Sequence, residues 1–168
     1  MTQRLFVALW PDEPTVERLV ELRDKLPEPD GVRFVRPEHW HVTLRFLGEV
    51  ETHHAIACLA GTRFPAVEVR LGPRTTRLGA GQVVVPATGA ERLAAEVRAA
   101  TSGLGLDDDR DFFGHLTLAR TKSGDGDALL DLHVVAAFTA RAISLVASEL
   151  RPTGAVYTTV ETFPTHCG

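Results

Sequence analysis

The chain has 168 residues, of which 44% are hydrophobic and 24% are charged, and its formal net charge at pH 7 is −4. This length suffices for one compact core and is short for two, so we expect residues 1–168 to form a single domain. The negative charge argues against a protein that coats long nucleic acid. No apolar run approaches the ~20 residues that span a bilayer, so we expect no membrane partner.

The two cysteines, Cys58 and Cys167, have no spacing that suggests a zinc site or a disulfide framework. The N-terminal apolar run is too short and poorly flanked for a signal peptide. We therefore expect a cytoplasmic protein. A monomer with no obligate protein partner is the simplest expectation.

Apolar alternation predicts strands, and apolar residues at helical spacing predict helices. In chain order, the pattern predicts a strand over 4–10, a helix over 12–26, strands over 32–36 and 40–47, a helix over 51–61, strands over 64–72 and 82–87, a helix over 89–105, a strand over 112–119, a loop over 121–130 and closing strands over 138–150 and 155–164. This order suggests two similar halves and indicates an α+β domain with mostly antiparallel strands.

The phrase His-apolar-Thr-Leu occurs twice, at 41–44 and at 115–118, once in each half of the chain. A chance match of all four residues is rare in a chain of this composition, and a repeated match is rarer still. Residues i and i+2 of a strand point the same way, so His41 shares a face with Thr43, and His115 shares a face with Thr117. The apolar residues between them face the core. Something polar should therefore meet the His and Thr face.

Two such strands lining one groove would bring two imidazoles and two hydroxyls together. One imidazole can take a proton from an attacking water while the other protonates a departing alkoxide across a phosphorus atom. The Thr hydroxyls can donate to the non-bridging oxygens, where charge develops. This arrangement suits metal-independent hydrolysis of a phosphodiester. The residues alone do not fix which imidazole is the acid and which the base.

Two more side chains lie beside the motifs. Arg45 alternates onto the face of His41 and is a further cationic candidate. Phe113 alternates onto the face of His115, where it could stack on a base. It could equally close the core between the two halves.

A metal site is the alternative use of these histidines, because His39, His53 and His54 lie near His41 in the sequence. Zinc needs three or four convergent ligands, and no local spacing supplies them. We therefore expect no metal and no cofactor.

The paired motifs resemble the signature of the two-histidine (2H) phosphoesterase superfamily. The segments "RLFVAL", "HVTLRFLGEV" and "HLTLAR", with Tyr157 and "FP" at 163–164, are similar to its RNA 2′,3′-cyclic phosphodiesterase branch, historically called 2′-5′ RNA ligases. One departure is Gly114, because the family usually has Pro before the second His.

The resemblance implies two pseudo-symmetric lobes, each a mostly antiparallel sheet with helices on the outside, around a central cleft. It implies that His41 is the proton donor, that His115 is the proton acceptor, and that Thr43 and Thr117 bind the phosphate. The family often has an Arg after the second motif, where Arg120 stands. Strict alternation turns Arg120 away from His115, so it reaches the phosphate only if the strand bulges or ends near Ala119.

The implied enzyme hydrolyses RNA 2′,3′-cyclic phosphodiester ends to 2′-phosphomonoesters, so its partners are RNA ends or small cyclic-phosphate nucleotides. Two alternatives stay open. One is a 2′-5′ RNA ligase or phosphodiesterase, or a cyclic phosphodiesterase for another nucleotide-derived substrate. The other is a binding module that recognises RNA ends without turnover.

Overall fold

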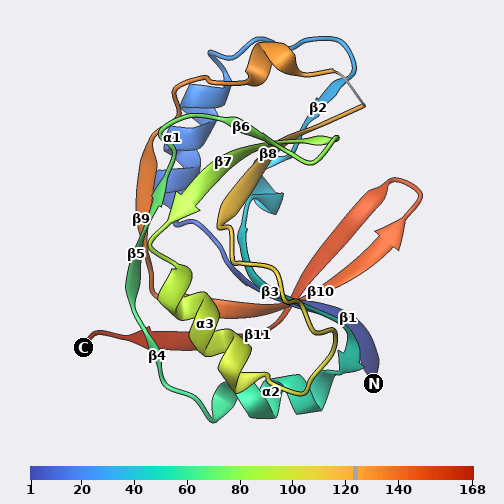
Figure 1. Cartoon of the computed structure of the whole chain (residues 1–168), viewed down its shortest axis with the longest axis vertical. Coiled ribbons are helices and arrows are strands. Elements are labelled where there is room, and N and C mark those ends of the chain that lie inside the picture. The colour runs from blue at the N-terminus through green and yellow to red at the C-terminus, as the bar shows by residue number, and fades with distance from the viewer. Residues whose placement is uncertain (123–124) are drawn as a thin grey trace.

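The computed structural model describes residues 1–122 and 125–168, in which strands predominate over helices (Figure 1). The helices are α1 (Glu13–Arg23), α2 (Thr52–Ala60) and α3 (Glu91–Ala100), with short 3₁₀ turns η1 (Pro37–His39) and η2 (Asp127–Leu129). The strands are β1 (Thr2–Leu9), β2 (Val32–Phe34), β3 (Val42–Glu51), β4 (Phe64–Pro65), β5 (Val67–Leu71), β6 (Thr76–Leu78), β7 (Gln82–Thr88), β8 (His115–Thr121), β9 (Ala136–Ala140), β10 (Ala142–Arg151) and β11 (Gly154–His166).

The strands of the described residues form one sheet path in the order β4-β11-β10-β1-β3-β8-β7-β5-β9, with β2 added beside β8 and β6 beside β7. The strand pairs are antiparallel except for the short pairing of β11 with β4. Figure 1 shows β10 and β11 projecting as a long hairpin. The prediction of an α+β fold with mostly antiparallel strands is confirmed.

Two groups of strands meet where β3 lies beside β8. The first group contains β1, β3, β10 and β11, and the second contains β2, β6, β7 and β8. In each group the motif strand pairs antiparallel with the strand that precedes a helix, as in β1–α1–β3 and β7–α3–β8, although β2 and η1 lie between α1 and β3. The similar halves suggested by the sequence correspond to this repeated unit.

The core lies behind the motif strands. Val42 and Leu116 are completely buried, as are Leu93 and Val97 of α3 and Leu59 of α2. Each such side chain contributes about 1.5–3 kcal/mol by leaving water. Because the apolar residues of β3 and β8 are fixed in this core, the alternate side chains of both strands must point the other way.

The predicted single strand over 138–150 is wrong. The chain forms two strands there, and exposed Arg141 lies between them. β9 pairs with β5, whereas β10 pairs with β1. Both segments have a strand-like pattern, and pattern alone does not say that successive residues join different neighbours.

The 3₁₀ turn η1 and strand β6 were not predicted. Of the expected loop over 121–130, residues 123–124 lie outside the described residues. Within 1–122 and 125–168, no helix combines the length and the apolar character that crossing a membrane requires.

Candidate active site

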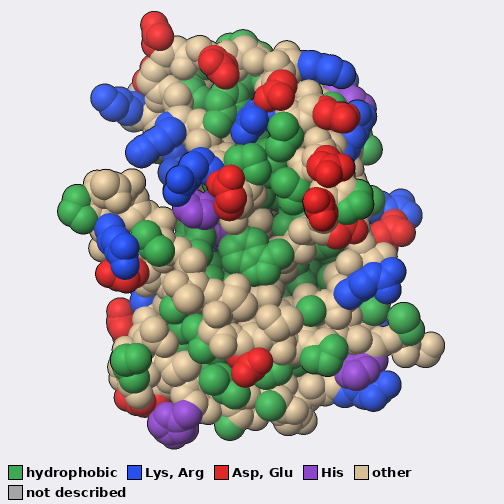
Figure 2. All heavy atoms as spheres, turned by 180° about the vertical axis from the view of Figure 1, so that it is seen from behind, with side chains coloured by type: hydrophobic (Ala, Val, Ile, Leu, Met, Phe, Trp, Pro, Cys, Tyr) green, Lys and Arg blue, Asp and Glu red, His purple; other side chains and the backbone are tan. Residues whose placement is uncertain are grey.

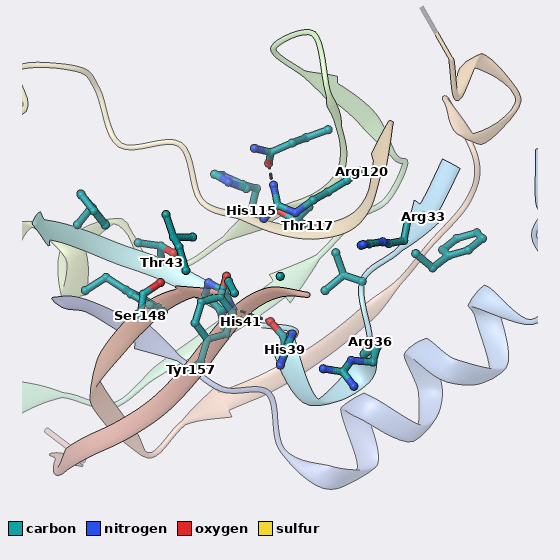
Figure 3. Close-up of a pocket in the computed structure, with 18 of the residues that line it drawn as sticks. Arg33, Arg36, His39, His41, Thr43, His115, Thr117, Arg120, Ser148 and Tyr157 are labelled. Atoms are coloured by element: carbon teal, nitrogen blue, oxygen red, sulfur yellow. Dashed lines mark hydrogen bonds between the residues drawn. The ribbon is translucent and has the colours of Figure 1, made fainter. Parts of the chain in front are cut away.

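A cleft of about 940 Å³ lies where the two strand groups meet. Its lining includes both sequence motifs, with His115 and Thr117 on one side and His41 and Thr43 on the other (Figure 3). The fold therefore brings together the four residues that the repeated phrase singled out. Their catalytic and phosphate-binding roles remain predictions.

The pairing of Val42 with Leu116 explains why the motifs converge. These two residues are antiparallel partners in β3 and β8, and both are fully buried. Continuing this register by one residue on either side puts His41 opposite Thr117 and Thr43 opposite His115. All four side chains then lie on the face away from the core, related by an approximate twofold axis through the Val42–Leu116 pair.

The two imidazoles are held in the same way. Nδ1 of His41 lies 2.6 Å from the carbonyl oxygen of His39, and Nδ1 of His115 lies 2.8 Å from that of Phe113. A carbonyl oxygen only accepts hydrogen bonds, so each Nδ1 carries a proton and donates it. Nε2 is then the nitrogen of each ring that can take up or release a proton.

His41 is enclosed by aromatic rings. Its centroid lies 5.1 Å from that of Phe6, 5.4 Å from that of Trp10 and 5.3 Å from that of Tyr157. Burial lowers the pKa of His41, and the positive charges of His115, His39 and Arg120 lower it further, whereas the hydrogen bond to the His39 carbonyl opposes this shift. At neutral pH the neutral imidazole of His41 is therefore favoured.

His115 stands in a more open setting. The ring of Phe113 is stacked on it, with 5.6 Å between the centroids and 20° between the planes, and Phe113 is 48% exposed. The open face of Phe113 is thus free to meet a ligand. Its stacking on a base remains a prediction.

Known phosphoesterases are similar to this chain. The model of the LigT like Phosphoesterase family matches residues 9–72. An RNA 2′,3′-cyclic phosphodiesterase of Thermus thermophilus is 30% identical in an alignment of 177 positions, gaps included, which covers 95% of this chain and 89% of the relative. One from Archaeoglobus fulgidus is 30% identical in an alignment of 135 positions, which covers 71% of this chain and 73% of that protein.

The chain belongs to the LigT-like phosphoesterase family. Among solved structures, a protein of T. thermophilus is 28% identical, with a TM-score of 0.82 over 98% of both chains. E. coli LigT complexed with phosphate is 26% identical, with a TM-score of 0.74 over 98% of both chains. The resemblance drawn from the paired motifs is confirmed.

This LigT-like chain has a β-bulge at the same place in both motifs. Along β3, Thr43 is opposite Ala8 and Arg45 is opposite the adjacent Val7, so Leu44 is an extra residue. Along β8, Thr117 is opposite Val84 and Ala119 is opposite the adjacent Val83, so Leu118 is an extra residue. The extra residue reverses the inward and outward alternation beyond it.

The bulge at Leu118 turns Arg120 into the cleft. Arg120 lines the cleft with His115 and Thr117, while Ala119 is buried. A bulge near Ala119 is the feature that, by the sequence analysis, Arg120 needs in order to reach a phosphate. By the matching bulge in β3, Phe46 takes the equivalent position and also lines the cleft.

The expectation that Arg45 shares the face of His41 is wrong, because the bulge at Leu44 turns Arg45 to the opposite side. Its guanidinium donates to the carbonyl oxygens of Thr101 at 2.7 Å and of Leu104 at 2.9 Å, and to the Thr101 hydroxyl at 2.6 Å. These groups follow the last turn of α3, where helix carbonyls lack partners and a cation is favoured. Arg45 is therefore a helix-capping residue, and the cleft lining does not include it.

Gly114 is required by close packing. A Cβ atom on this residue would lie 2.4 Å from the carbonyl oxygen of Ala87, a contact that the backbone would have to relieve. The Ala87 amide also donates to the Gly114 carbonyl at 2.8 Å. These two contacts fix the chain immediately before His115, so the departure from Pro at this position leaves the strand entry well held.

Sequence reasoning missed several residues that line the cleft. Gln82 contacts the second motif directly, since the Thr117 hydroxyl donates to its Oε1 at 3.1 Å. Arg4, Arg33 and Arg36 also line the cleft, and in the described part of the chain no acidic side chain does. Their positions in β1, β2 and just before η1 gave no local sign of a shared site.

The cleft is therefore positively charged in a chain whose net charge is −4. Figure 2 shows the surface hollowed beside the projecting hairpin, with Lys and Arg side chains gathered next to a histidine. A cleft lined by charges of one sign concentrates ligands of the opposite sign. Arginine is well suited to bind phosphate through two parallel hydrogen bonds.

Proposed function

We propose that this LigT-like phosphoesterase hydrolyses RNA 2′,3′-cyclic phosphodiester ends to 2′-phosphomonoesters. The observation that carries the proposal is the placement of His41 and His115 in one cleft, each with Nδ1 bound to a carbonyl and Nε2 left for proton transfer. The relatives from T. thermophilus and A. fulgidus are named RNA 2′,3′-cyclic phosphodiesterases, which supports the choice of substrate.

In the proposed reaction the cyclic phosphate lies between the two imidazoles. A water oxygen attacks phosphorus while Nε2 of His115 accepts its proton. The bond from phosphorus to the 3′ oxygen breaks on the opposite side, and Nε2 of His41 donates a proton to that oxygen. The ring opens, the phosphate stays on the 2′ oxygen, and proton exchange with solvent resets both imidazoles.

The surroundings of His41 suit a proton donor. Burial and the positive charges of His115 and Arg120 lower the pKa of His41, so its imidazolium is a stronger acid than a free one. A bound phosphate anion brings the opposite charge and favours protonation at this position. His41 therefore carries the proton that it donates when the substrate is bound.

The other cleft residues take positioning and charge-stabilising roles. Thr43, Thr117 and Arg120 donate to the non-bridging phosphate oxygens, where negative charge grows in the transition state. Gln82 accepts the Thr117 hydroxyl proton until the phosphate takes its place as acceptor, and Phe113 stacks on the terminal base. Because both strand groups supply lining residues, residues 1–168 act as one bilobal domain in this proposal.

The decisive experiment is hydrolysis of a short oligonucleotide that ends in a 2′,3′-cyclic phosphate, measured with and without EDTA. We expect turnover that EDTA does not reduce and a product with its phosphate on the 2′ oxygen. A 3′-phosphomonoester product would show that the 2′ oxygen, and not the 3′ oxygen, is the leaving group. Binding without any turnover would contradict the proposed hydrolysis and indicate a module that binds RNA ends.

A further inference from the structure

Two cleft arginines lie beyond the residues that the proposed reaction uses. Arg33 belongs to β2, and Arg36 lies three residues further on, just before η1. Both line the cleft that holds His41 and His115 (Figure 3). Both are exposed on this side of the molecule.

Arg33 and Arg120 are direct cross-strand partners in β2 and β8. Like charges placed opposite each other on neighbouring strands repel and cost stability. Gln82 of β7 is the partner of Arg120 on its other side, so no carboxylate flanks this pair in the sheet. Anionic groups bound beside both guanidinium groups would relieve this repulsion.

Neither Arg33 nor Arg36 makes a salt bridge or a side-chain hydrogen bond within residues 1–122 and 125–168. Elsewhere on the surface, arginines such as Arg70, Arg110 and Arg151 are paired with carboxylates. The cleft arginines are thus available to a ligand without first breaking an internal ion pair.

Arg33 lies beside Arg120, and the chain from Arg33 to Arg36 extends beyond the position of a single phosphate. The segment from Phe34 to Arg36 is mostly extended, so the Cα atoms of Arg33 and Arg36 are separated by up to ~10 Å. A stacked nucleic acid strand advances ~3.4 Å per nucleotide. Because ~10 Å is more than one such step, side chains from this segment can reach a phosphate beyond the one that Arg120 and His115 hold.

We infer that Arg33 and Arg36 form a second phosphate subsite, which binds the backbone phosphate joining the terminal nucleotide to its neighbour. This inference rests on the proposed function, because it takes the reacting group to be an RNA end. The preferred substrate is then an oligonucleotide with at least one internal phosphate. A mononucleoside 2′,3′-cyclic phosphate fills only the reacting position.

The test compares two substrates, a mononucleoside 2′,3′-cyclic phosphate and a dinucleotide that has one internal phosphate and the same cyclic end. We expect the wild-type kcat/KM to be at least about tenfold higher for the dinucleotide, the size of one charge-assisted hydrogen-bond pair. In the R33A/R36A variant this ratio falls toward one. The salt dependence of dinucleotide binding also decreases by about one ion per lost phosphate contact.

Two controls separate position from charge. The R63A/R141A variant removes two exposed arginines outside the cleft lining, with the same change in net charge, and we expect it to keep the wild-type ratio. The R33K/R36K variant keeps the charge but loses the planar fork, and we expect it to recover part of the ratio. A ratio unchanged in R33A/R36A, or lowered equally in R63A/R141A, overturns the subsite.

A binding measurement keeps this test independent of turnover. The affinity of a dinucleotide ending in a 2′-phosphate is compared with that of a mononucleoside 2′-phosphate, in the wild type and in R33A/R36A. The subsite predicts tighter dinucleotide binding that the variant loses, even if the cyclic substrates are not hydrolysed. Equal wild-type affinities would refute the subsite, whereas absent hydrolysis of both cyclic substrates would refute only the proposed function.

Discussion

The ring of Tyr157 meets the imidazole of His41 edge-on, with 5.3 Å between the centroids and 82° between the planes. Tyr157 lies on β11, far from His41 in the sequence, and its ring also packs on Phe6 at 5.4 Å and His39 at 5.0 Å. It therefore helps to keep water from the first-motif histidine. Within the described residues His115 has no equivalent enclosure, because Phe113 is the only aromatic ring that packs on its imidazole.

Replacing Tyr157 by Ala should raise the pKa of His41. Burial is the largest cause that lowers this pKa, and the smaller side chain admits water to the imidazole. Tyr157→Phe keeps the ring and should leave the pKa of His41 close to the wild-type value. NMR titration of the His41 ring measures both, and equal pKa values in the Ala and Phe variants would show that Tyr157 does not desolvate His41.

Each motif histidine should be essential for turnover. We expect His41→Asn and His115→Asn to lower kcat by ~10²–10⁴-fold, the usual contribution of one acid or base. His54→Asn is the matched control, because His54 is exposed and lies outside the cleft lining. Circular dichroism checks that each variant is folded. A folded variant that keeps more than about a tenth of the activity would remove that histidine from the mechanism.

The pH dependence of kcat/KM should be bell-shaped. The acceptor must be neutral, so activity falls on the acid side, and the donor must be protonated, so activity falls as pH rises through the pKa of His41. Because the pKa of His41 is lowered, this second fall begins below the ordinary imidazole value of about 6.5. A rate that climbs steadily through neutral pH would contradict a protonated imidazole donor at either position.

Arg45→Ala should destabilise the protein without removing a cleft residue. The substitution leaves the carbonyl oxygens of Thr101 and Leu104 without their guanidinium donor, which costs about 1–3 kcal/mol of unfolding free energy. Urea denaturation measures the loss, and kcat/KM is measured well below the transition. A large fall in kcat/KM with unchanged stability would show that Arg45 acts in the active site after all.

Local pattern was a good guide to the motifs and a poor guide to what lies beyond them. The repeated phrase identified four cleft residues because strand alternation acts over two residues only. The same alternation was wrong for Arg45, since the bulge at Leu44 adds a residue to the strand. A bulge depends on how two strands pair, so the sequence of one strand does not predict it.

The remaining lining residues came from pairings that no local pattern specifies. Arg33 lies beside Arg120 because β2 pairs with β8. Tyr157 contacts His41 because the sheet order β11-β10-β1-β3 brings the last strand to the same side of the molecule as the first motif. The split of 138–150 between β9 and β10 has the same origin. In each case the choice of neighbour depends on burial of the whole sheet.

By itself, the sequence determined the α+β class, most strands and helices, and the two His and Thr pairs, because hydrophobic periodicity and short motifs are local properties of the chain. Only the tertiary structure decided that both pairs line one cleft, that Arg120 enters it while Arg45 leaves it, and that Arg33 and Arg36 complete its positive wall. Those facts depend on long-range strand pairing, whose register is set by packing among residues distant in the chain.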